Sequence, residues 1–340
     1  MEAEPQKSYL KALKIMLLVP SWFSHKIVSE TLSKALNAEL VYYEPKKIFY
    51  IFKKCIRNPI IFMAGGMKSH VRATLYYSNV RSRRYIYIGS TGIYKYSYYH
   101  HLAHQMDYRF VHPSNFHCEI MRKIGYKNIY HIPHAYPIDL DLPDNVVISK
   151  IKERKNKRKK FTLLSIFTSH SLYKGIQHYL NTLEYINSKI RVVIKISDKA
   201  FIPNSKNKDV IIIPGTLSRN DIINLILSSD IVVVPSLIEG FGLPILEALR
   251  LGRPVITLDA PPMNEINNKK VGYLVKIEKR KVIDRGESID ILNYPNITDF
   301  AEKIEEAVND PNWEEKCFNA FQYAKNNFNP YVLYRKFLSI

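Results

Sequence analysis

Two glutamates eight residues apart, Glu239 and Glu247, are the side chains of this sequence whose type and spacing point most directly to chemistry. Glu239 opens the turn EGFG, and Glu247 falls within the first turns of an expected helix, so both carboxylates can face the same crevice. Carboxylate oxygens accept hydrogen bonds from neighbouring hydroxyls, which sugars and riboses present in pairs. The pair therefore indicates a site for hydroxyl-rich ligands.

The segment around these glutamates is also expected to bind an anion. Residues 230–234 predict a buried strand, Pro244 suits the first turn of a helix, and Gly252 suits its C-terminal end. Between strand and helix, the glycines allow close approach of the backbone, and the N–H groups and dipole of the helix start attract phosphate. The backbone groups expected to contact this phosphate belong to Gly240, Phe241, Gly242 and Leu243.

The whole stretch 235–252, PSLIEGFGLPILEALRLG, resembles the E-x7-E signature of retaining glycosyltransferases of the group 1 type (glycosyltransferase family 4, GT-B fold). The resemblance implies an α/β protein with two doubly wound, Rossmann-like domains that face each other across a cleft. It implies transfer of a sugar from a nucleotide-diphosphate donor, with retention at the anomeric carbon and without a metal or other cofactor. In that scheme Glu239 contacts the sugar and Glu247 the ribose. The alternative is an ordinary strand–loop–helix unit with solvated glutamates.

A lysine–glycine pair supplies the expected cation. The family carries an arginine and a lysine–glycine pair in the loop after the first strand of its second domain, and Lys174-Gly175 matches the pair. Lys174 would neutralise the departing diphosphate. The arginine is replaced by Thr168 or Ser169, and we expect Ser169 to lie beside the donor. Two later lysines could supply the missing charge: Lys195 and Lys199.

The loop after the strand expected at 210–214 is predicted to lie beside the nucleotide base. The family places the base against this loop, which assigns the contact to the backbone of Thr216 and Leu217. A helix is expected to start near Ser218, with Asp221 in its first turn.

The first hundred residues follow the family in rhythm. An apolar strand at 13–19, a helix from about 25 to 36 and a strand at 41–43 form a βαβ pattern, in which ligands meet the loops at the carboxyl ends of the strands. Further strands are expected at 60–63 and 85–88. The residues assigned to the acceptor or cleft side from these loops and from the later turn at 134–139 are Ser21, Gly89, Ser90 and His134.

Residues 110–140 resemble the family more closely. They predict a strand, a Pro-Ser step at 113–114, a helix ending at Gly125, and a strand that closes on a turn where His134 replaces the usual asparagine. Upstream, three histidines (His100, His101 and His104) lack a carboxylate partner at metal-binding spacing, so we interpret them as a surface cluster. The acidic pair in the turn at 139–141 is likewise not interpreted as a metal site.

With 340 residues, the chain can hold two domains. The basic run KIKERKNKRKK at 150–160 has no apolar stripe and predicts a polar linker. The predicted divisions are an acceptor-side domain at 1–150, a linker at 151–160, a donor domain at 161–328, and a C-terminal helix at about 329–340 that returns to the first domain.

The net charge of +19 favours polyanionic or phosphorylated partners. Residues 46–57, KKIFYIFKKCIR, place apolar side chains on one helical face with lysines on its flanks, which is typical of a helix at an anionic membrane surface. A core helix with solvated lysines explains the pattern equally well. The three scattered cysteines and the absence of a long apolar run predict a cytoplasmic protein, at most peripherally bound to membrane.

Three other functions compete with this interpretation. The charge could indicate a nucleic-acid-binding protein, but the basic and aromatic residues form no recognised binding module. The missing arginine and the altered turn at His134 could indicate a catalytically inactive GT-B scaffold. A phosphorylase of the same fold is a third possibility. The sequence leaves the nucleotide, the sugar and the acceptor open, with glycan, lipid and protein acceptors all allowed.

Overall fold

A computed structural model describes residues 15–20, 26–43, 60–64, 84–88, 91–105, 107–167, 172–197 and 209–340. The chain divides into two compact units. The first comprises residues 1–137, 286–288 and 330–340, and the second comprises residues 138–285 and 289–329. The chain thus passes from the first unit to the second at residues 137 and 138, whereas the sequence places this passage at 151–160.

The first unit contains a six-stranded parallel sheet in the order β2-β1-β3-β4-β6-β7. Four consecutive residues of β4, from Tyr85 to Ile88, are almost fully buried, as expected for a parallel strand covered on both faces. The strands are β1 Met16–Pro20, β2 Glu39–Tyr43, β3 Ile60–Ala64, β4 Arg84–Ile88, β6 Tyr108–His112 and β7 Ile129–His131, with a short β5 at Ile93–Tyr94. The helices are α2 Lys26–Leu36, α5 Tyr98–Gln105 and α6 Asn115–Lys123.

The C-terminal residues pack within this first unit. Helix α14 (Pro330–Leu333) and the 3-10 turn η5 (Tyr334–Leu338) lie against α2. The Tyr334 hydroxyl accepts a hydrogen bond from the Ala135 amide at 3.0 Å, and the Phe337 ring packs edge-on against Tyr85 and Tyr87. The last residues therefore contribute to the core of the first unit.

The second unit contains a parallel sheet in the order β10-β9-β8-β11-β12-β13. Numbered along the chain, this is the strand order 3-2-1-4-5-6 of a doubly wound parallel sheet. From the first strand the chain adds strands toward one edge, and from the fourth strand it adds them toward the other edge. The strands are β8 Phe161–Phe167, β9 Ile190–Ile196, β10 Val210–Pro214, β11 Ile231–Val234, β12 Val255–Leu258 and β13 Gly272–Val275. The switch point therefore lies between β8 and β11, which pair directly.

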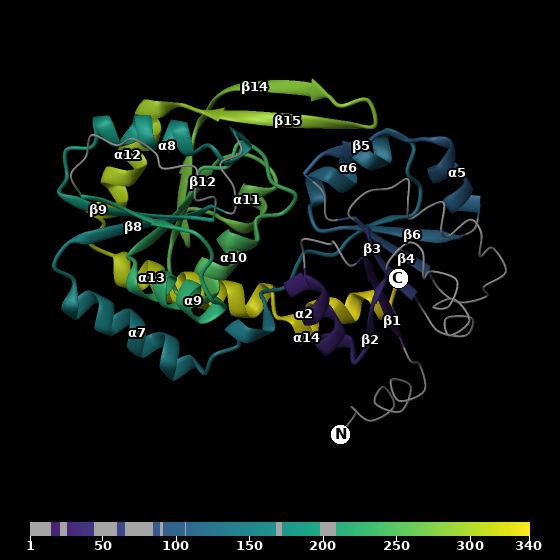
Figure 1. Ribbon diagram of the computed structural model, residues 1–340, viewed down its shortest axis with the longest axis horizontal. Coiled ribbons are helices and arrows are strands. Elements are labelled where there is room, and N and C mark those ends of the chain that lie inside the picture. The colour runs from purple at the N-terminus through teal and green to yellow at the C-terminus, as the bar shows by residue number, and fades with distance from the viewer. Residues whose placement is uncertain are drawn as a thin grey trace. The chain divides into compact units, whose positions relative to one another are not determined.

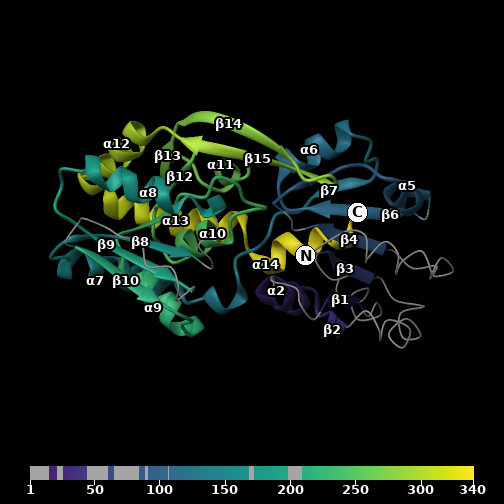
Figure 2. The same cartoon turned by 45° about the horizontal axis from the view of Figure 1, so that its top comes forward.

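Helices cover both faces of this sheet, with α8 and α12 over one face and α7, α9 and α13 over the other (Figure 1; Figure 2). Helix α10 packs on α13, and α13 packs on α7. The helices are α7 Asp144–Lys157, α8 Ile176–Thr182, α9 Arg219–Ser228, α10 Leu243–Arg250, α11 Met263–Ile266, α12 Ile297–Val308 and α13 Trp313–Asn327, with 3-10 turns η2 Ile138–Leu140, η3 Leu172–Lys174 and η4 Leu183–Tyr185.

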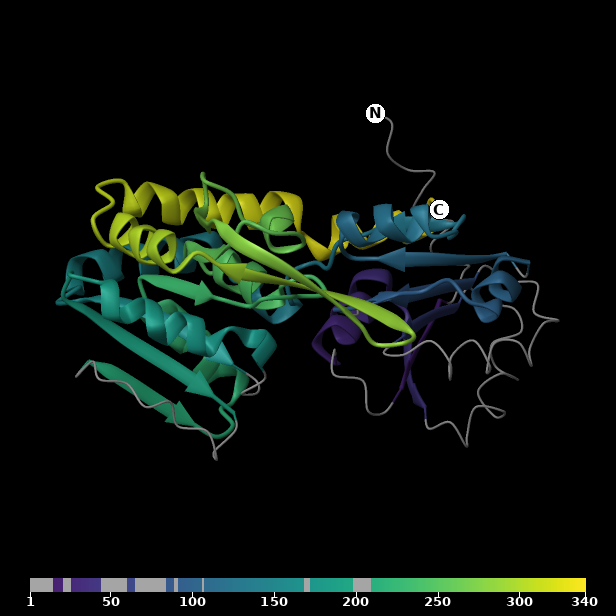
Figure 3. The same cartoon turned by 90° about the horizontal axis from the view of Figure 1, so that it is seen from above.

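An antiparallel hairpin interrupts the second unit between β13 and α12. Its strands, β14 (Ile277–Asp284) and β15 (Ser288–Pro295), form a ribbon outside the six-stranded sheet (Figure 3). The sequence analysis did not identify this hairpin. Its strand β14 is exposed and carries charges at most positions, so it lacks the apolar alternation that marks a half-buried strand.

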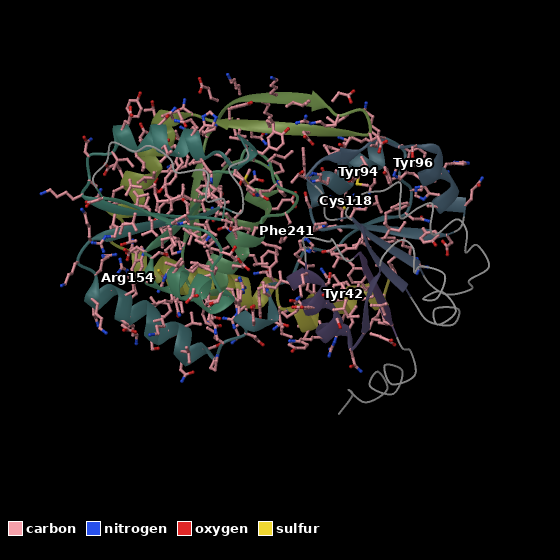
Figure 4. The ribbon with its side chains drawn as sticks, in the orientation of Figure 1. Tyr42, Tyr94, Tyr96, Cys118, Arg154 and Phe241 are labelled. Carbon is pink, nitrogen blue, oxygen red and sulfur yellow. The ribbon has the colours of Figure 1, made fainter. Side chains whose placement is uncertain are left out.

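The basic run expected as a linker is mostly helix α7. Val147 and Ile151, four residues apart, are fully buried on one face of this helix. Arg154, one turn further and labelled in Figure 4, donates two hydrogen bonds to the buried carboxylate of Asp230, at 3.0 and 2.5 Å. The linker prediction was wrong because two apolar residues and one paired arginine are enough to hold a helix whose remaining surface is solvated.

Removing the Asp230 carboxylate should destabilise the second unit strongly. Asp230 is fully buried and also accepts a hydrogen bond from the Thr162 amide at 2.7 Å, so Asp230→Ala leaves an arginine and a buried N–H without their acceptor. We expect a loss of about 3 kcal/mol in the free energy of unfolding, measured by urea denaturation. Glu153→Ala, which removes an exposed carboxylate from the same helix, should leave the unfolding midpoint nearly unchanged.

The three clustered histidines do not form the expected surface patch. His100 is 3% exposed and packs on the Tyr126 ring with 4.8 Å between centroids. His104 stacks on Tyr96, and only His101 is exposed. Burial lowers the pKa of His100 to about 4, so the ring is neutral at physiological pH. The prediction was wrong because neutral imidazoles pack as aromatic rings.

Candidate active site

The two residues expected to perform catalysis come from the two central strands of the second unit. Lys174 lies in the loop that follows β8, and Glu239 lies in the loop that follows β11. These strands meet at the switch point of the sheet, where the loops diverge to opposite faces and leave room for a ligand at the carboxyl ends. The topology therefore brings together two residues that lie 65 positions apart in the chain.

Lys174 and Glu239 form an ion pair. The Lys174 ammonium donates a hydrogen bond to Glu239 Oε1 at 2.7 Å, a short charge-assisted contact. The Glu239 side chain is 10% exposed and the Lys174 side chain 28%. The sequence assigned the two residues separate roles, and the structure adds their direct contact. An ammonium held in this way remains partly open to an incoming anion.

The two loops that carry this pair are closely joined. Leu237 donates its amide hydrogen to the Tyr173 carbonyl at 2.8 Å, which links the residue before Lys174 to a residue just before Glu239. Gly175 has φ +67°, and a Cβ built there would lie 2.0 Å from the Pro235 carbonyl oxygen. Any side chain at position 175 would therefore push the loops apart, which explains why a glycine follows the lysine.

Helix α10 begins as the sequence predicts, directly after the Glu239 turn. Gly242 is the N-cap with φ +119°, Pro244 lies in the first turn, and the chain turns away at Gly252. The first amides of a helix lack carbonyl partners in a preceding turn, so the backbone at Gly242 and Leu243 offers N–H groups to an anion. The Phe241 ring (labelled in Figure 4) is 4% exposed and packs on Phe328, so only its backbone can serve a ligand.

Glu247, on α10, is held by an arginine that the sequence analysis did not single out. Arg219, the first residue of α9, contacts Glu247 Oε1 through Nη1 at 2.8 Å. The same guanidinium binds Asp139 in a bidentate manner, at 2.7 and 3.2 Å. The capping box of Ser218 and Asp221 locates the start of α9 from sequence, but no local pattern connects Arg219 to a residue 28 positions away.

The environment of Glu247 affects its ionisation. Burial raises the pKa of the Glu247 carboxyl, because a partly desolvated carboxylate is costly, and the Arg219 guanidinium opposes that rise. Arg219 thus orients the carboxylate and favours its charged form. Asp139, which was not interpreted as a metal ligand, serves here as the second anchor of the arginine.

Replacing Arg219 with alanine should weaken nucleotide binding about tenfold, since a charge-assisted hydrogen bond that orients Glu247 is lost. Without the guanidinium, the pKa of Glu247 should rise further, so the loss of affinity on acidification should begin at a higher pH than in the wild type. Isothermal titration with nucleoside diphosphates across a pH series measures both effects. Arg191→Ala, an exposed arginine of the same unit, is the control, and identical pH profiles for Arg219→Ala and wild type would exclude this role.

Lys195, considered as a substitute for the missing arginine, lies beneath the expected base-binding loop. It is 2% exposed, and its ammonium donates a hydrogen bond to the Gly215 carbonyl. Burial lowers the pKa of this ammonium. Lys195 therefore supports the loop in which Thr216 is exposed and Leu217 half-buried, and its own charge does not face the surface.

His134, expected on the acceptor side, is a buried link within the first unit. It is 2% exposed, its Nδ1 lies 2.6 Å from the Tyr87 hydroxyl, and the two rings meet edge to face. His134 therefore packs on Tyr87 within the first unit, and its side chain is not exposed as an acceptor-side residue would be. The other sequence-predicted positions lie outside the described residues: Ser21, Gly89, Ser90, Ser169, Lys199 and the segment 46–57.

The described residues contain neither a candidate metal site nor a candidate membrane span. Within the described ranges, no three His, Cys, Asp or Glu side chains are grouped so that they could hold a metal ion. None of the helices in the described part of the chain is long and apolar enough to cross a membrane.

Known proteins resemble this chain in sequence and in fold. Residues 147–326 match the family described as glycosyl transferases group 1. A viral protein, uncharacterized glycosyltransferase 335 of Sulfolobus islandicus rod-shaped virus 1, is 25% identical over 283 residues, which cover 78% of this chain and 82% of the relative.

Two solved structures are similar over most of the chain. Anabaena HepE in complex with UDP and glucose has a TM-score of 0.69 at 14% identity, with coverage of 96% of this chain and 98% of the other. Sucrose-phosphate synthase from Thermosynechococcus elongatus has a TM-score of 0.70 at 14% identity, with the same coverage. At such identities these likenesses establish the fold alone.

Proposed function

The chain belongs to the glycosyl transferases of group 1, and from that membership we propose that it transfers a sugar from a nucleotide-diphosphate donor to an acceptor hydroxyl, with retention at the anomeric carbon and without a metal ion. The expected fold class, two doubly wound Rossmann-like domains of the GT-B type, is confirmed. The observation that carries the proposed reaction is the Lys174–Glu239 ion pair beside the N-terminus of α10, at the switch point of the second sheet.

The first requirement of this reaction is stabilisation of the leaving group. When the bond between the anomeric carbon and the diphosphate breaks, negative charge grows on the phosphate oxygens. Lys174 and the amides of Gly242 and Leu243 would meet that charge from two sides, with the dipole of α10 behind the amides. These groups are held in place before the substrate binds, so little reorganisation is needed as the charge develops.

The two glutamates would hold the two sugars of the donor. Glu239 binds Lys174 through Oε1, and its Oε2 can accept a hydrogen bond from a hydroxyl of the transferred sugar. Glu247, held by Arg219, would accept hydrogen bonds from the ribose hydroxyls. In this assignment the reacting carbon, which is the anomeric carbon of the transferred sugar, lies between Glu239 on the sugar side and Lys174 on the diphosphate side.

Retention follows if the acceptor attacks from the face that the diphosphate leaves. The acceptor oxygen then forms its bond to the anomeric carbon as the phosphate oxygen departs, and the hydroxyl proton passes to that phosphate oxygen. A pair of carboxylates flanking the scissile bond, as in glycoside hydrolases, is not required. The acceptor is a glycan, lipid or protein hydroxyl, and a basic segment at 46–57 would favour an acceptor at an anionic membrane surface.

A thermal-shift screen with UDP, GDP, ADP and their sugars tests the donor. We expect UDP and a UDP-sugar to stabilise the protein, since solved relatives of this fold carry UDP; a ligand at about 100 times its Kd adds about 2.7 kcal/mol. The protein should also hydrolyse that UDP-sugar slowly and release UDP. When an acceptor is added, the transferred sugar should have the same anomeric configuration in the product as in the donor. Salt-dependent binding of duplex DNA with no response to any nucleotide would overturn the proposal.

A further inference from the structure

We infer that the hairpin β14–β15 positions the Lys174–Glu239 pair for catalysis, with Asn293 as the positioning residue; this inference rests on the proposed function. The hairpin is not part of either six-stranded sheet, and most of β14 is exposed. One buried polar side chain on β15, Asn293, nevertheless points at the loop that carries Glu239.

Asn293 donates two hydrogen bonds to one backbone atom of this loop, the Leu237 carbonyl oxygen. Its main-chain N–H donates to the Leu237 carbonyl at 2.8 Å, and its side-chain Nδ2 donates to the same oxygen at 3.3 Å. Asn293 is 3% exposed and Leu237 is 2% exposed, so these bonds lie away from water. Leu237 is two residues before Glu239, a distance over which a fixed peptide determines where the carboxylate lies.

The same peptide segment also fixes the lysine. The Leu237 N–H donates to the Tyr173 carbonyl at 2.8 Å, and Tyr173 directly precedes Lys174. Asn293, Leu237 and Tyr173 thus form a continuous hydrogen-bonded path from the hairpin through both catalytic loops. A shift of the hairpin would move the two members of the ion pair together or apart.

Two arginines of the hairpin complete the connection. Arg280 pairs with Asn293 across the two strands and donates from Nε to Asn293 Oδ1 at 3.0 Å, which leaves Nδ2 facing Leu237. Arg285 lies 5.5 Å above the Tyr173 ring and is held by Asp290 at 3.1 Å. The hairpin therefore contacts both loops, each through a side chain that a second residue holds in place.

The consequence for the reaction is geometric. Lys174 must meet the diphosphate while Glu239 holds the sugar attached to it, so a displacement of either loop separates groups that act on adjacent atoms. Misplacement on the order of 1 Å can cost up to about a hundredfold in rate. The hairpin should thus affect kcat strongly and nucleotide affinity little, because a displaced Lys174 keeps its charge near the diphosphate and the ribose site at Glu247 is held separately by Arg219.

Asn293→Asp and Arg280→Ala test this inference in the full-length protein. Asn293→Asp keeps the shape and the acceptor for Arg280, but it replaces the side-chain donor to Leu237 with a carboxylate oxygen that the Leu237 carbonyl repels; the main-chain N–H of residue 293 remains. Arg280→Ala removes the group that orients the amide. With the UDP-sugar found in the donor screen, we expect each to lower kcat about tenfold while the Kd for UDP changes less than about twofold. The double variant should lose little more than either single one. Lys281→Ala, which replaces the residue next to Arg280 on β14, is the matched control and should retain wild-type kcat.

The outcomes separate this inference from the proposed function. Unchanged kcat in Asn293→Asp and Arg280→Ala, with an active wild type, would overturn the positioning role and leave the proposed function intact. Parallel losses of kcat, UDP affinity and melting temperature would indicate a purely structural role and would also overturn it. A wild-type protein that cleaves no nucleotide sugar would overturn the proposed function itself.

Discussion

Glu239→Gln should lower kcat for sugar transfer by about a thousandfold, the largest effect expected of any single replacement. The amide keeps the volume of the side chain but removes the negative charge. That charge holds Lys174 at 2.7 Å and strengthens the hydrogen bond that the carboxylate accepts from a sugar hydroxyl. Both the cation and the sugar would then lose their orientation in the transition state. The fold should survive, because Lys174 is 28% exposed and can be solvated once its partner is neutral.

The measurement is kcat and KM for donor cleavage, together with the Kd for UDP. Because UDP lacks the transferred sugar, its affinity should change little in Glu239→Gln. Glu184→Gln, an exposed glutamate of the same unit, is the matched control. Turnover in Glu239→Gln close to that of the wild type would remove this residue from the mechanism.

Lys174→Ala should lower kcat about a hundredfold, equivalent to about 2.7 kcal/mol of transition-state stabilisation. The ammonium is the one group of the ion pair that can oppose the charge growing on the diphosphate, and α10 supplies only partial charges. Loss of this charge should weaken UDP binding as well, since the diphosphate is present in UDP and in the nucleotide-sugar donor. Lys189→Ala, an exposed lysine of the same unit, is the control.

A donor with a different leaving group separates the roles of the two residues. A glycosyl fluoride releases fluoride instead of a nucleoside diphosphate, so its cleavage should depend much less on Lys174 and still depend on Glu239. Equal losses in Lys174→Ala with both donors would contradict the assignment of this lysine to the leaving group.

Much of the fold follows from local sequence signals. The strand before Glu239, the start of α10 at Gly242 and its end near Gly252 are determined by apolar runs, a proline and glycines that adopt positive φ. The capping box at Ser218 and Asp221 marks the start of α9 in the same way. Helix α7 and the hairpin β14–β15 were missed because both are mostly exposed and charged, and a few buried side chains hold each one.

The sequence alone determined the residue types of the candidate site and the strand–loop–helix unit that carries them, because these depend on interactions between near neighbours. Only the tertiary structure decided how they combine: Lys174 with Glu239, Arg219 with Glu247 and Asp139, and Asn293 with Leu237. Each of these contacts joins residues separated by 28 to 80 positions, and the strand order of the sheet brings the first pair together. Such pairings depend on burial and topology, which no local pattern of residues encodes.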